Sequence, residues 1–167
     1  MNELEAYRAN IEKLADLESK EVFGNGKAEH AMVIFETFFK RAKENIVIFC
    51  KDLSEKVFNS DNLISLAEDA LRRKARVTIL TQSDPKSDKF VAACSRWKEE
   101  KLPITMRVSK PGSSASSTTA NFAVMDRKAY RFEPNREEKT AFACMNNESA
   151  CATLLGVFSR LELEQPA

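Results

Sequence analysis

Side chains that bind phosphate well are concentrated in the last third of the chain. Residues 113–119 form a run of hydroxyl groups, and amides and cations follow it. Hydroxyl, amide and guanidinium groups are favourable hydrogen-bond partners of phosphate oxygens. We therefore predict a cleft for an anionic ligand, lined by Ser116, Ser117, Asn121, Arg127, Lys128, Arg131, Asn146 and Asn147. Two simpler interpretations stay open: the hydroxyl run is only a flexible connection, and Arg131 only pairs with Glu133 or Asp126.

Catalytic groups are scarce by comparison. His30 is the only histidine, so histidine-based nucleophilic or acid–base catalysis has a single candidate group in this chain. The sequence contains no glycine-rich phosphate loop, no G-x-S-x-G elbow and no H-E-x-x-H motif. Carboxylates are abundant, but their spacing does not require a metal site. We predict no catalytic residue, no metal site and no cofactor.

The four cysteines indicate a reducing environment. Cys50, Cys94, Cys144 and Cys151 each lie in an apolar stretch, and none forms a C-x-x-C pair. We predict free, buried thiols and a cytoplasmic protein. The amino-terminal segment is charged from its third residue, unlike a secretory signal, and the apolar runs are too short to cross a bilayer.

Charge is unevenly distributed along the chain. The formal net charge is +1, but residues 1–22 carry six acidic and three basic side chains, a local charge of −3. The remaining residues therefore carry +4, a mild basic bias that is weaker than in an obvious nucleic-acid-binding domain.

Apolar periodicity predicts alternating helices and strands. Helices are expected over 2–22, 27–43, 60–74, 87–101 and 149–161, and strands over 45–50, 76–81, 104–108, 121–125, 129–133 and 140–145. The alternation between residues 27 and 108 is typical of βαβ crossovers, and residues 121–133 are typical of a β-hairpin. These features predict an α/β domain with a mixed sheet.

An additional helix precedes this domain. Leu4, Tyr7, Ile11 and Leu14 repeat at heptad-like spacing with charged residues between them. The stripe predicts a helix, within residues 1–23, that docks on the main domain at 27–163. Docking on a second copy of the chain or on a partner helix is the alternative.

The order of elements and the segments NFAVMDRKAYRFEPN and AFACMNN resemble the phospholipase D-like (PLD-like) family. The resemblance implies a mixed sheet sandwiched by helices. It also implies an active site built on H-x-K-x-x-x-x-D, in which histidine is the nucleophile and lysine neutralises phosphate. This chain has Asn121 at the histidine position, Ala123 at the lysine position and Lys128 at the aspartate position.

The altered motif favours binding over catalysis. The leading hypothesis is a non-catalytic PLD-like module that contacts a protein partner, a second copy or a nucleic acid, within a bacterial multi-protein system such as phage defence. The alternatives are a divergent nuclease or phosphodiesterase that uses carboxylates, and a domain that senses phosphate or nucleotides in the relic cleft.

Overall fold

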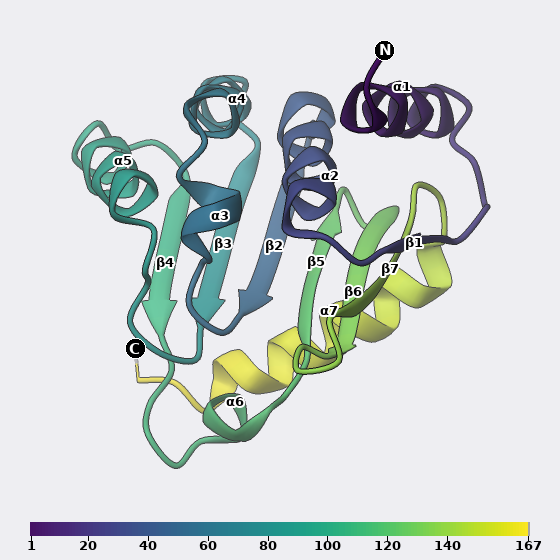
Figure 1. The fold of residues 1–167 in the computed structure, drawn as a ribbon. Coiled ribbons are helices and arrows are strands. Elements are labelled where there is room, and N and C mark those ends of the chain that lie inside the picture. Colours follow the sequence, from purple (N-terminus) through teal and green to yellow (C-terminus); the bar gives the residue numbers. More distant parts are fainter. Residues whose placement is uncertain (167) are drawn as a thin grey trace.

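The computed structural model describes residues 1–166 and shows a mixed sheet of seven strands in the order β1-β7-β6-β5-β2-β3-β4 (Figure 1). Strands β2, β3 and β4 are parallel, and β2 joins the antiparallel remainder through β5. The predicted mixed α/β sheet is confirmed. The strands are β1 (Phe23–Asn25), β2 (Asn45–Cys50), β3 (Arg76–Thr81), β4 (Ile104–Val108), β5 (Asn121–Met125), β6 (Ala129–Asn135) and β7 (Thr140–Cys144).

Helices cover both faces of the sheet. Figure 1 shows α2, α4 and α5 on one face and α7 crossing the other. Within residues 1–166, no helix is both long and apolar enough to cross a membrane. The helices are α1 (Glu3–Asp16), α2 (Ala28–Arg41), α3 (Glu55–Phe58), α4 (Asp61–Arg72), α5 (Asp88–Glu99), α6 (Ser114–Ser117) and α7 (Glu148–Leu163).

Side-chain alternation along the strands builds two hydrophobic clusters. Ile46 and Ile48 of β2 belong to the cluster beneath α2 and α4, whereas Phe49 belongs to the cluster beneath α7. All three side chains are fully buried. The near-continuous apolar sequence of β2 thus reflects a strand covered on both faces.

The first helix is shorter than predicted. It ends at Asp16 because Glu18 adopts a left-handed φ of 48° and the chain turns back on itself. The Ser19 amide donates to the Leu14 carbonyl (2.9 Å) and the Glu18 amide to the Ala15 carbonyl (3.1 Å), the two bonds of a Schellman cap. The following residues then reach β1, which pairs with β7, forms one edge of the sheet and was not predicted.

Helix α1 docks on the body of the same chain. Ile11 and Leu14 of the predicted stripe are buried, and the Tyr7 ring stacks on His30 with centroids 3.9 Å apart. The guanidinium of Arg8 also lies 3.0 Å from the buried carboxylate of Glu36 on α2. The apolar stripe of α1 therefore packs against the core of its own chain.

The four cysteines are free and buried, as predicted. Burial raises the pKa of Cys50, Cys94 and Cys151 to about 12. Their thiols are consequently neutral near pH 7, and they act as small apolar groups.

Candidate functional site

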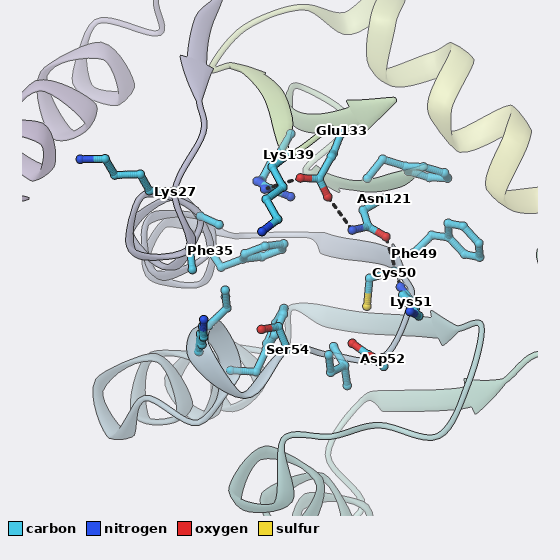
Figure 2. A pocket seen from close by; sticks show the side chains of 18 of the residues that line it. Lys27, Phe35, Phe49, Cys50, Lys51, Asp52, Ser54, Asn121, Glu133 and Lys139 are labelled. Carbon is cyan, nitrogen blue, oxygen red and sulfur yellow. Dashed lines mark hydrogen bonds and ion pairs between the residues drawn. The ribbon is translucent and has the colours of Figure 1, made fainter. Parts of the chain in front are cut away.

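A pocket of about 420 Å³ opens where β2 ends and β5 begins (Figure 2). Register explains its position, because β5 runs antiparallel to β2 and its first residues lie beside the last residues of β2. The lining comes from the start of α2, the loop after β2, helix α3, strands β5 and β6, and the turn before β7. The polar lining residues are Lys27, Lys51, Asp52, Ser54, Lys56, Asn121, Arg131, Glu133 and Lys139.

Asn121 is held at the inner end of this pocket by both ends of its amide. Its Oδ1 accepts a hydrogen bond from the backbone N–H of Lys51 (3.1 Å), and its Nδ2 donates to Oε1 of Glu133 (2.7 Å). Glu133 lies directly opposite Asn121 in the β5–β6 register. The amide therefore has one fixed orientation and links the end of β2 to β6 (Figure 2).

Arg131 lies one row deeper on the same face of the sheet. It is paired in register with Ala123 on β5 and with Ala143 on β7, and these two small residues leave room for its side chain. Arg131 is only 7% exposed, its Cζ lies 5.7 Å from the centre of the Phe35 ring, and its Nη2 lies 3.9 Å from Oε2 of Glu133. Desolvation lowers the pKa of Arg131, but a guanidinium still keeps its charge at neutral pH.

The pocket mouth carries an excess of positive charge. The exposed lysines Lys27, Lys51, Lys56 and Lys139 come from four different segments, and Asp52 is the one acid among the described mouth residues. With Arg131 and Glu133 included, five cationic and two acidic side chains line the pocket, a net charge of +3. Lys27 is also paired with Glu3 (2.9 Å), which lies outside the lining. Such a site attracts anions.

The loop between β2 and α3 has a strained turn at the pocket wall. Leu53 has a φ of 53°, which is unfavourable for a bulky residue. Its side chain is 1% exposed, so burial in the core offsets the strain. The loop that contains this turn carries Lys51, Asp52 and Ser54 at the pocket.

The structure does not bring the eight predicted cleft residues together. Asn121 and Arg131 line the pocket. Ser116 and Ser117 lie in α6, where their hydroxyls donate to the carbonyls of Ser113 and Ser114. The remaining four lie at the opposite end of the β5–β6 hairpin, around its turn and the start of α7: Arg127, Lys128, Asn146 and Asn147.

The groups around the hairpin turn have structural partners. The carboxylate of Asp126 accepts hydrogen bonds from the backbone N–H groups of Lys43, Glu44 and Asn45. Lys128 pairs with Glu18, and this hydrogen bond lowers the pKa of the Glu18 carboxyl. The Asn147 side chain caps α7 by accepting from the Ala150 amide (2.9 Å).

The four mouth lysines were not predicted. Two of them could have been predicted from the sequence. Lys51 directly follows a buried strand and Lys56 lies just beyond it, and ligands often bind at the carboxyl ends of parallel strands. Lys27 and Lys139 carried no such signal. They approach the pocket only through the packing of α2 and the turn between β6 and β7.

The fold can be compared with known proteins. No family model matches the sequence, and no curated protein matches it either. Among solved structures, the phospholipase D family member Nuc from Salmonella typhimurium matches 87% of this chain and 95% of its own, with a TM-score of 0.59 and 11% identity. The chain has a PLD-like fold.

Two further structures share this fold. NucT from Helicobacter pylori matches 87% of this chain and 98% of its own, with a TM-score of 0.58 and 10% identity. TrmBL2, an archaeal chromatin protein described with a novel mode of DNA binding, matches 98% of this chain with a TM-score of 0.66 and 14% identity. The present chain spans 63% of the TrmBL2 chain. At these identities the comparisons establish the PLD-like architecture of the chain.

Proposed function

We propose that this chain is a non-catalytic PLD-like module that binds nucleic acid at the Asn121 pocket. The observation that carries the proposal is the combination of a fixed amide at the PLD-like nucleophile position and a net charge of +3 around it. The pocket thus has the charge for phosphate and lacks the nucleophile for cleaving it.

The non-catalytic part rests on Asn121 and Ala123. An amide has no basic nitrogen that could attack phosphorus, and both ends of the Asn121 amide are already engaged in hydrogen bonds. Ala123 is fully buried and uncharged at the position where the PLD-like motif has a lysine. The nearest cation in that row is Arg131, which comes from the neighbouring strand.

The nucleic-acid part rests on the lysines at the mouth. They are exposed and surround the entrance from four segments, so they can contact successive phosphates of an extended chain. TrmBL2, of whose chain the present chain spans 63%, is described with a novel mode of DNA binding, which agrees with nucleic acid as the proposed ligand class.

The test compares mouth lysines with a lysine outside the pocket. We expect the double variant Lys51→Gln/Lys56→Gln to bind a labelled oligonucleotide more weakly, measured by fluorescence anisotropy over a range of salt concentrations. The slope of log K against log salt should fall by about 1 for each substituted lysine that binds a phosphate in the wild-type protein. Lys98→Gln, which changes an exposed residue of α5, is the matched control.

Two results would contradict the proposal. Equal binding by the double variant and Lys98→Gln would remove the pocket as the binding site. Cleavage of the oligonucleotide by the wild-type protein, abolished by Asn121→Ala, would show a catalytic site and favour the divergent-nuclease alternative. A protein partner or second copy, and a role in a multi-protein defence system, stay predictions.

A further inference from the structure

The pocket has two zones of different charge. At its inner end, Arg131 and Glu133 form a cation–carboxylate pair (3.9 Å) beside the neutral amide of Asn121, so this zone has no net charge. The side chains of Arg131 and Glu133 are only 9% and 13% exposed. The excess positive charge lies at the exposed mouth, on Lys27, Lys51, Lys56 and Lys139.

An apolar wall connects the two zones. Phe35, Leu53, Val57 and Phe58 are buried residues that line the pocket, and the rings of Phe35 and Phe58 lie 4.9 Å apart. Figure 2 shows Phe35 between the segment that carries Lys27 and the Asn121–Glu133 pair. The volume of about 420 Å³ lies within the usual range for sites that enclose a small organic molecule.

This distribution fits one unpaired nucleotide. We propose that the inner zone holds the base of a single-stranded nucleic acid and that the mouth lysines hold the adjacent phosphates. This inference rests on the nucleic-acid binding proposed above and specifies the substrate as single-stranded. In a duplex the bases are stacked and paired, so none can enter a pocket of this size without being extruded.

Chemical complementarity supports a base rather than a phosphate at the inner end. A phosphate placed there would approach the Glu133 carboxylate, which repels anions. The edge of a base instead presents neutral donors and acceptors. A carboxylate accepts from base N–H groups, whereas the second N–H of the Asn121 amide nitrogen and the Arg131 guanidinium can donate to base nitrogen and oxygen atoms.

The first test compares probes of equal length. Fluorescein-labelled single-stranded DNA, the corresponding single-stranded RNA and the blunt DNA duplex are titrated against the wild-type protein at low salt. We expect the single strands to bind roughly tenfold more tightly than the duplex, because each stacked or buried base contributes about this factor. The DNA and RNA arms identify which strand is preferred.

The Glu133→Gln variant should change single-strand affinity in opposite directions, depending on whether a base or a phosphate occupies the inner end of the pocket. If a base lies at the inner end, loss of the carboxylate acceptor should weaken single-strand binding by roughly tenfold while duplex binding stays unchanged. If a phosphate lies there, removing the negative charge should strengthen binding. Thermal unfolding of the variant verifies that it is folded.

A second variant fills the pocket without touching its polar groups. Ala28 is exposed at the first turn of α2 and lines the pocket, so Ala28→Trp should obstruct the entrance and leave the lysines in place. We expect single-strand affinity to fall to the duplex level.

The outcomes separate this inference from the proposed function. Salt-sensitive binding that depends on Lys51 and Lys56 but is equal for single strands and duplex would overturn the single-strand inference alone. Unchanged or tighter single-strand binding by folded Glu133→Gln would do the same. No binding of any probe by the wild-type protein would overturn both proposals.

Discussion

The two ends of the β5–β6 hairpin carry similar residues and differ in what those residues contact. At the end where β5 begins, Asn121, Arg131 and Glu133 lie in a pocket whose mouth carries four exposed lysines. At the turn, Asp126 binds three backbone N–H groups and Lys128 pairs with Glu18. Polar groups at the turn make contacts within the fold, whereas those at the other end pair with one another and also line a space that a ligand can enter.

This difference shows why residue type and closeness in sequence are weak guides to a binding site. Arg127 and Lys128 are within seven positions of Asn121 in the sequence, yet a β-strand of five residues separates them in space. Lys27 and Lys139 are distant in sequence and still line the same pocket as Asn121. Stability and affinity measurements on variants at the two ends of the hairpin can test this contrast.

Arg131→Ala should destabilise the protein the most. Glu133 would keep its charge in a nearly buried site without its cation, and breaking a buried pair in this way costs about 3 kcal/mol. Urea unfolding measures the loss. The double variant Arg131→Ala/Glu133→Ala should recover part of it, and a double variant whose loss equals the sum of the two single losses would show that the pair is not coupled.

Asp126→Ala should destabilise the protein by about 2 kcal/mol, because three backbone donors at the start of β2 lose a charged acceptor. Asp126→Asn, which keeps one oxygen, should lose less. Oligonucleotide affinity of the folded variants should stay at the wild-type value. A drop in affinity comparable to that of Lys51→Gln/Lys56→Gln would contradict the division between the two ends.

Arg127→Gly should stabilise the protein slightly. Asp126 and Arg127 have φ values of 52° and 59°, the geometry of a type I′ turn, in which glycine is favoured at the second central position. Relief of the left-handed strain is worth about 1 kcal/mol. Arg127→Ala keeps a Cβ and is the control; it should show no such gain, and neither variant should change oligonucleotide affinity.

Much of the fold could be predicted from the sequence because its signals are local. Apolar runs and turn residues predicted the strands at 45–50, 76–81, 104–108 and 121–125, and these agree with β2, β3, β4 and β5. Strand β1 could not be predicted, because the three residues FGN have little strand preference and form a strand only beside β7. The end of α1 at Asp16 was also missed, because Glu18 takes the left-handed position that glycine usually occupies.

The candidate site also has features that the sequence could predict and features that it could not. The residue types at the PLD-like motif positions and the hairpin over residues 121–133 could be predicted from the sequence, and the structure shows the register that pairs Asn121 with Glu133 and Ala123 with Arg131. Which cations surround Asn121 depends on the three-dimensional arrangement of segments that are distant in sequence. Four lysines meet at the end of the sheet where β2 ends and β5 begins, because the βαβ crossovers and antiparallel pairings bring their segments there. They come from the residue before α2, the loop after β2, helix α3 and the turn before β7.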